Sequence, residues 1–155
     1  MTVDPLQRLA ELGLVLPEVP RPAAAYQPWA RVDDLILTAG QLPMVDGALP
    51  RTGRLGAELD TAEGAKQARI AALNVLAVGA TATGALERVR VVKLTVFVAS
   101  ADGFHEQHLV ANGASELLGA VLGDAGVHAR AAVGVASLPL DAPVEVEAVL
   151  EVVAG

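Results

Sequence analysis

The stretch that decides the fold lies near the C-terminal end and reads, from residue 128 to residue 148, HARAAVGVASLPLDAPVEVEA. Small and β-branched residues fill positions 129–137, and apolar and acidic residues alternate over positions 144–153. Such runs predict two strands, and the prolines between them predict a turn. We therefore expect the two strands to form a hairpin, with Arg130 on the first strand and Glu145 on the second.

Arg130 is one of only 11 basic residues in the chain, and its neighbours are small and apolar. A guanidinium in such a setting suits a small carboxylate ligand, which it can bind through two parallel hydrogen bonds. Glu145, Glu147 and Glu151 share one face of the second strand. This face is either solvated, as in many antiparallel strands, or it brings Glu145 to a water molecule near Arg130. A structural ion pair across the hairpin is also allowed.

The rest of the chain alternates between helical and strand patterns. Asp4 and Gly13 bracket a short helix over 4–13, with Pro5 in its first turn. Apolar residues at helical spacing predict longer helices over 60–80, with Asp60 or Thr61 as cap, and over 103–122.

Strands are predicted over 35–39 and 90–98. In the second of these, Val92, Leu94, Val96 and Val98 alternate with Lys93, Thr95 and Phe97, which predicts two opposite faces. Intermixed strands and helices indicate an α+β protein whose two long helices cover one face of a single sheet.

Composition excludes several classes of function. The net charge is −7 and the only lysines are Lys66 and Lys93, so nucleic acid is a poor binding partner for the chain. It has no cysteine, and therefore neither a disulfide nor a thiolate site. His105 and His108 are spaced i,i+3, which does not match the helical zinc motif, so no metal site is expected.

Ser115 and Ser137 have no His–Asp partner nearby in the sequence, so no hydrolase triad is predicted. No apolar run approaches the length of about 18 residues that a membrane span needs, and no targeting segment is recognisable. We expect a cytoplasmic protein without a membrane partner.

Several segments, in this order, resemble the Rid (YjgF-like) family of enamine/imine deaminases. The markers are Tyr26, the TAGQLP segment at 38–43, ARIAALN at 68–74, VKLTVFV at 92–98, Phe104, Asn112, Arg130 and Glu145. The resemblance covers residues from about Pro22 to Val153. It implies a chorismate-mutase-like fold with a mixed six-stranded sheet, and a homotrimer with clefts between subunits.

The same resemblance implies a cofactor-free enzyme that hydrolyses small 2-imino or enamine acids to 2-keto acids and ammonia. Arg130 is then the clamp for the substrate carboxylate, and Glu145 positions the hydrolytic water. The substrate-binding positions that the resemblance implies are Tyr26, Ala39, Gly40, Asn112 and Ala132. Ala39 stands where many members have serine, and Ala132 replaces a frequent cysteine, although its backbone carbonyl is retained.

Two other functions stay open: a small-molecule binding or regulatory trimer without turnover, and the endoribonuclease or translation inhibitor of older family labels. Residues 1–22, a helix followed by a proline-rich extended arm, are expected to precede a single Rid-like domain at 23–155. This arm resembles a divergent subgroup of the family.

Overall fold

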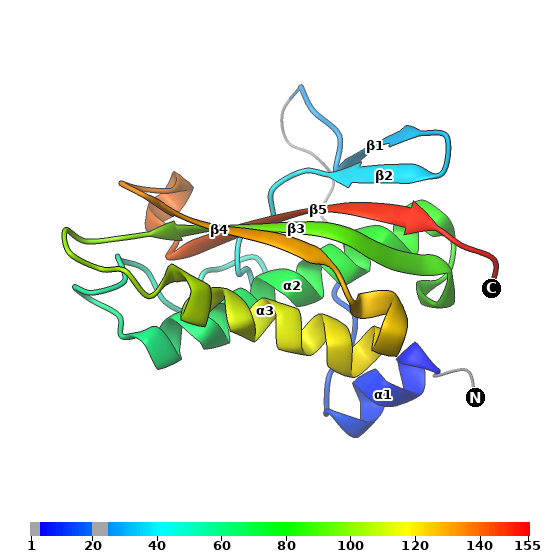
Figure 1. Ribbon diagram of the computed structural model, residues 1–155, viewed down its shortest axis with the longest axis horizontal. Helices are drawn as coiled ribbons and strands as arrows, with labels where there is room; N and C mark the ends of the chain where they lie inside the picture. Colours follow the sequence, from blue (N-terminus) through cyan, green and yellow to red (C-terminus); the bar gives the residue numbers. More distant parts are fainter. Residues whose placement is uncertain (1–3, 20–24) are drawn as a thin grey trace.

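The structure is a computed structural model that describes residues 4–19 and 25–155. Its centre is a mixed sheet with the strand order β1-β2-β5-β3-β4 (Figure 1). The strands are β1 (Trp29–Val32), β2 (Leu35–Thr38), β3 (Val89–Ala99), β4 (Ala129–Val135) and β5 (Val144–Val152). The pair β3–β4 is parallel, and the other neighbours are antiparallel.

The prediction of six strands is wrong for the described residues, which form a sheet of five. After β2 the chain makes only an isolated bridge to β5, between Gln41 and Val146. Pro43 has no N–H group to donate, and the chain turns at Gly47 with a φ of +80°, so pairing does not continue. The predicted boundary between residues 22 and 23 lies outside the described residues.

The predicted hairpin of the last two strands is also wrong. Among the described strands β4 pairs with β3 alone, and β3 lies between β4 and β5. The segment from β3 through helix α3 (Gln107–Leu122) to β4 is a parallel crossover, which needs a long connection. The short 3₁₀ helix η3 (Pro139–Asp141) then carries the chain past the end of β3 to its other side.

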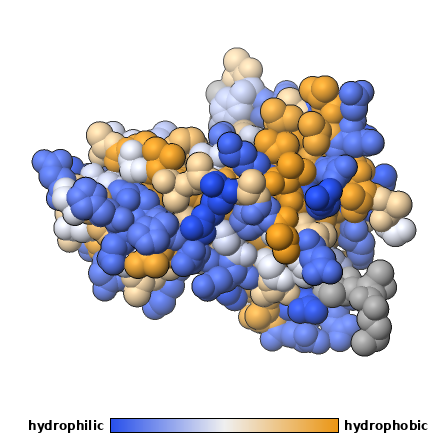
Figure 2. Space-filling model, viewed as in Figure 1, coloured by the Kyte–Doolittle hydropathy of each residue, from blue (hydrophilic) through white to orange (hydrophobic). Residues whose placement is uncertain are grey.

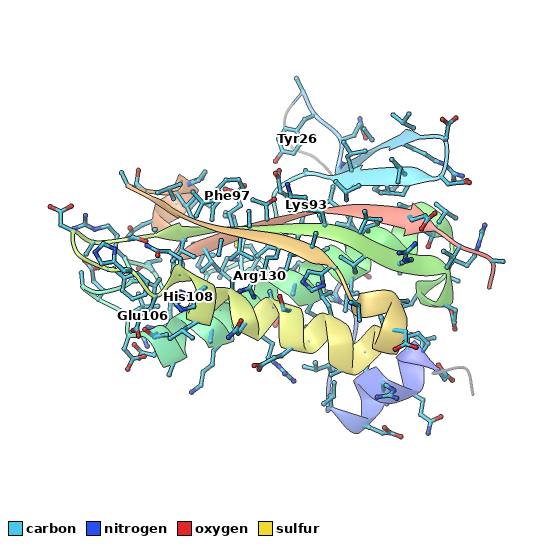
Figure 3. The ribbon with its side chains drawn as sticks, viewed as in Figure 1. Tyr26, Lys93, Phe97, Glu106, His108 and Arg130 are labelled. Atoms are coloured by element: carbon cyan, nitrogen blue, oxygen red, sulfur yellow. The ribbon has the colours of Figure 1, made fainter. Side chains whose placement is uncertain are left out.

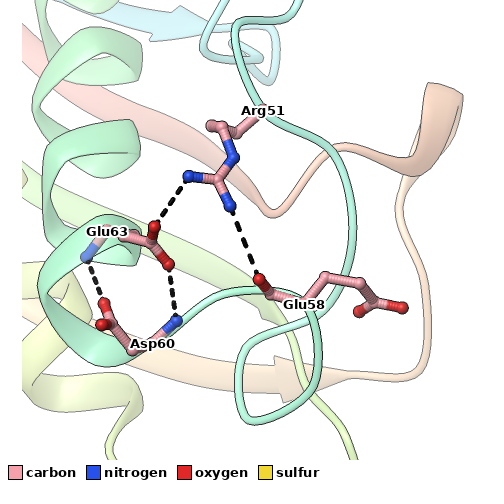
Figure 4. A network of polar contacts seen from close by, with 4 residues as sticks. All are labelled: Arg51, Glu58, Asp60 and Glu63. Carbon is pink, nitrogen blue, oxygen red and sulfur yellow. Dashed lines mark hydrogen bonds and ion pairs between the residues drawn. The ribbon is translucent and has the colours of Figure 1, made fainter.

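Helices α2 (Thr61–Thr83) and α3 lie side by side on one face of the sheet, as predicted (Figure 1). Asp60 is the N-cap of α2 and forms a capping box with Glu63, whose carboxylate also accepts a 2.7 Å hydrogen bond from Arg51 (Figure 4). The short helix α1 (Pro5–Glu11) begins after the N-cap Asp4 and packs against α3. The core lies between the sheet and the two long helices.

Two local predictions need correction. Helix α3 begins at Gln107 rather than at residue 103, because Gly103 has a φ of +81° that a right-handed helix does not contain. Val92 does not join the buried face of β3, because a bulge between Val91 and Lys93 shifts the register. Val92 is 37% exposed, and the buried side chains are those of Val91, Leu94, Val96 and Val98.

The other face of the sheet carries no helix (Figure 1). Its apolar side chains include Leu35 and Leu37 of β2 and Val133 of β4, which are exposed to 40%, 43% and 42%. Figure 2 shows apolar side chains gathered over the β1–β2 hairpin at the upper right of the view. No described helix is both long and apolar enough to cross a membrane.

Candidate functional site

Arg130 lies between the edge strand β4 and helix α3 (Figure 3). It is paired in register with Leu94 of β3, which is fully buried beneath the helices, so both side chains point to the helical side. Its Nη1 group donates to Asn112 Oδ1 at 2.9 Å and to Ser115 Oγ at 3.1 Å. Its Nη2 group donates to the carbonyl oxygen of His108 at 3.2 Å. No described carboxylate forms an ion pair with it.

Ser115 also lies 2.9 Å from Nε2 of His128, and Nδ1 of His128 lies 2.6 Å from the carbonyl oxygen of Gly126. The sequence analysis did not predict this contact, because Ser115 and His128 lie 13 residues apart in the chain. A signal was present in the spacing. His108, Asn112 and Ser115 fall on one face of a helix, and His128 lies two residues before Arg130, directly before β4.

Glu145 lies on β5 opposite Phe97 of β3, and it points to the face of the sheet without helices. The backbone of Gln41 bonds to Val146 in both directions, at 2.7 and 2.9 Å, which brings Gly40 beside Glu145. A Cβ atom at Gly40 would overlap Oε1 of Glu145, so only glycine leaves this carboxylate in place. Burial, and secondly the charge of Glu147, raises the pKa of Glu145 above its ordinary value.

A cavity of about 1050 Å³ lies beside Gly40. Tyr26, Ala39 and Leu140 contribute to its wall. Tyr26 lies three residues before β1 and is 62% exposed. Asn74 of α2 donates to the carbonyl oxygens of Leu42 and Met44, at 2.9 and 3.1 Å, and so fixes the loop that forms one side of the cavity.

The predicted site residues therefore form two groups within one chain. The first group, between β4 and α3, contains Arg130, Asn112 and Ala132; the second contains Glu145, Gly40, Ala39 and Tyr26.

Arg130 is in register with Leu94 of β3, and Glu145 is in register with Phe97 of β3. Leu94 and Phe97 are an odd number of residues apart on that strand. Successive strand residues point to opposite faces, so the two side chains lie on opposite sides of the sheet. The interpretation that a hairpin brings them together in one chain is wrong. Among the described residues no cluster of three or more His, Cys, Asp or Glu side chains could hold a metal ion.

The α+β sheet with two helices on one face is the chorismate-mutase-like fold. Over residues 6–152 the sequence matches the family described as "YjgF/chorismate_mutase-like, putative endoribonuclease". The chain belongs to this YjgF-like family, which confirms the family resemblance of its sequence motifs.

Several relatives match nearly the whole chain. Protein TCP17 of Trypanosoma cruzi is 48% identical over 145 residues, which are 92% of this chain and 91% of that protein. The crystal structure of Atu1372, a protein with unknown function from Agrobacterium tumefaciens, is 48% identical with a TM-score of 0.89, covering 96% of this chain and 92% of that one.

A "putative endoribonuclease" from Shewanella oneidensis MR-1 is 33% identical with a TM-score of 0.92, covering 96% of this chain and 99% of that one. Escherichia coli TdcF, whose structure contains bound serine, shares the fold at 23% identity and a TM-score of 0.63, covering 88% and 94% of the two chains.

Proposed function

We propose that the protein is a cofactor-free hydrolase that converts small 2-imino and enamine acids to 2-keto acids and ammonia. The observation that carries this proposal is the guanidinium of Arg130. Three protein acceptors hold it in place, yet no described carboxylate neutralises it. A fixed, uncompensated guanidinium favours an anionic ligand, and a small carboxylate matches its geometry.

In the proposed reaction Arg130 binds the substrate carboxylate and Glu145 holds a water molecule. An enamine first gains a proton at carbon and loses one from nitrogen, which converts it to the imine. The water oxygen then bonds to the imine carbon while one of its protons passes through Glu145 to nitrogen, which gives a carbinolamine. The hydroxyl proton of this intermediate passes to nitrogen by the same route, the C–N bond breaks, and ammonia and the 2-keto acid are released. The raised pKa of Glu145 suits this role, because a carboxylate with a higher pKa is a better proton acceptor.

The remaining predicted residues shape the pocket in this proposal. Asn112 orients the guanidinium through its 2.9 Å contact. Gly40 and Ala39 leave room beside Glu145, Tyr26 forms a wall, and the carbonyl group of Ala132 helps to orient the water.

The proposal requires a second copy of the chain, because the two groups of residues face opposite sides of one sheet. A homotrimer would bring the Arg130 group of one protomer against the Glu145 group of its neighbour. The exposed apolar residues on the helix-free face, such as Leu37 and Val133, supply a surface to bury. Light scattering should give three times the chain mass of 15.8 kDa. A monomer that still hydrolyses imines would contradict the shared site.

The activity is tested by a coupled assay. An amino-acid oxidase generates 2-imino acids in the presence of semicarbazide, and added protein should divert the imine from the semicarbazone to free keto acid. Arg130→Ala should lower kcat/KM by at least 30-fold, since a charge-assisted contact is lost, and Arg130→Lys should restore little of it. Arg8→Ala, a change on helix α1, is the matched control and should retain activity. Wild-type turnover by Arg130→Ala would remove Arg130 from the mechanism.

The same protein and its variants distinguish the proposed hydrolase from the two alternative functions. A binding or regulatory trimer would bind pyruvate at Arg130 without accelerating imine hydrolysis, and the alanine at position 39 in place of serine makes this outcome the main competitor. An endoribonuclease would cleave RNA at a rate that depends on the salt concentration. The net charge of −7 opposes the binding of RNA. We also propose that the protein is cytoplasmic and has neither a nucleic-acid nor a membrane partner.

A further inference from the structure

The hydrogen bonds of Arg130 leave two N–H donors of its guanidinium without a partner among the described residues. An arginine side chain carries five N–H donors. Both Nη1 hydrogens have acceptors, Asn112 Oδ1 and Ser115 Oγ, and one Nη2 hydrogen has the carbonyl group of His108. The Nε hydrogen and the second Nη2 hydrogen have no hydrogen-bond partner among the described residues. Nε and Nη2 belong to one edge of the planar group, which matches the two oxygens of a carboxylate.

When the ring of His128 is neutral, the contacts behind Ser115 have one consistent direction of donation. The carbonyl group of Gly126 can only accept, so the hydrogen between it and His128 is on Nδ1. In the neutral imidazole Nε2 is then an acceptor, and the hydroxyl of Ser115 donates to it. Arg130 can only donate, so its Nη1 hydrogen points at the remaining lone pairs of Ser115 Oγ.

We propose that Ser115 and His128 are positioning residues for Arg130: they fix both Nη1 hydrogens and so present the Nε–Nη2 edge of the guanidinium to the ligand carboxylate. His128 sets the direction of the Ser115 hydroxyl, and Ser115 in turn holds Nη1. The inference rests on the proposed function only for the nature of the ligand, because the hydrogen-bond chain stands on the described residues alone.

A role in positioning makes a specific kinetic prediction. In Ser115→Ala the guanidinium keeps its charge and its contacts to Asn112 and His108, but Nη1 loses one acceptor and the group can rotate. KM for the imine and Kd for pyruvate should rise about tenfold, the effect of one hydrogen bond to a charged group, while kcat changes by less than about threefold. Ser115→Thr keeps the hydroxyl and should restore binding. His128→Ala should behave as Ser115→Ala does.

Matched controls exist for both changes. Ser137→Ala and His105→Ala remove an exposed serine and an exposed histidine outside the chain of hydrogen bonds. Both should leave KM and Kd unchanged. Circular dichroism melting of every variant at one protein concentration separates a binding defect from unfolding.

Two readouts keep this inference distinct from the proposed function. Pyruvate binding, measured by isothermal titration calorimetry, tests the role of Ser115 even if no imine is hydrolysed. Nitrogen-15 NMR of the imidazole tests the hydrogen-bond chain without any ligand, and the neutral ring of His128 should be protonated at Nδ1. A neutral ring protonated at Nε2, or an unchanged Kd in a folded Ser115→Ala variant, would overturn the inference.

Discussion

Gly113→Ala tests the packing that holds helix α3, and with it Asn112 and Ser115, against helix α2. A Cβ atom at Gly113 would overlap the carbonyl oxygen of Ala65, and it would lie 2.7 Å from the carbonyl carbon and 3.0 Å from the Cα of that residue. These are backbone atoms in the second turn of α2, so no side-chain rotation can relieve the overlap. The two helices would have to move apart.

The magnitude follows from two opposing effects. Forcing a methyl group into a packed interior costs about 3 kcal/mol, the upper part of the range for overpacking, because the obstacle is backbone. Alanine in place of glycine in a helix favours folding by about 1 kcal/mol. The free energy of unfolding should therefore fall by about 2 kcal/mol, which lowers Tm by about 4–8 °C in a chain of this size.

Urea unfolding followed by circular dichroism, at one protein concentration, measures the change directly. Gly119→Ala is the matched control in the same helix, since nothing lies within 4 Å of its added Cβ. It should raise the free energy of unfolding by up to about 1 kcal/mol. The reasoning is refuted if Gly113→Ala is as stable as the wild type, or if both variants lose stability equally.

Three further changes have separate expected outcomes. Gly40→Ala should displace the Glu145 carboxylate, lowering imine turnover at least about tenfold while the thermal melt moves little, since a flexible side chain can give way; unchanged turnover would refute the role of this close approach. Glu145→Gln should raise Tm at pH 7, because the raised pKa of Glu145 means that folding disfavours its charged carboxylate. The gain in Tm should vanish below pH 4.5, where the carboxyl group is protonated in both the folded and the unfolded state. A gain that persists at pH 4 contradicts this. Glu63→Gln should lower Tm at pH 7 and flatten the acid limb of a Tm–pH profile. The backbone N–H of Asp60, and then Arg51, lower the pKa of Glu63, so its contribution is present above pH 4.5 and lost as the pH falls through the lowered pKa. Glu87→Gln, a change at an exposed glutamate, is its control.

The elements of this protein were largely readable from local sequence. Asp4 and Asp60 were both candidate N-caps and are the N-caps of α1 and α2. The two long helices cover one face of the sheet, as their apolar periodicity indicated. These features depend on residues within one or two turns of each other, so a short window of sequence contains the information. Trp29–Val32 was missed as a strand, since it is only four residues long and directly follows Pro28.

The failures concern contacts between distant residues. Nothing in the pattern of residues 129–153 shows whether the two strands pair with each other or with a third strand between them. A bulge at Val92 is likewise invisible, because it depends on the register that β5 imposes on β3. The contact between Ser115 and His128 joins a helix to the start of a strand, and the sequence contains only the spacing of each element by itself.

The sequence by itself determined the α+β class, the helices and most strands, and the family, because side-chain type and period are local properties. Only the tertiary structure decided how the predicted site residues are grouped. The parallel pairing of β4 with β3 places Arg130 with Asn112, Ser115 and His128 on the helical side. The antiparallel pairing of β5 with β3 places Glu145 beside Gly40 on the opposite side. Which face a strand residue occupies relative to another strand depends on their long-range register, and this is settled only when the whole sheet assembles.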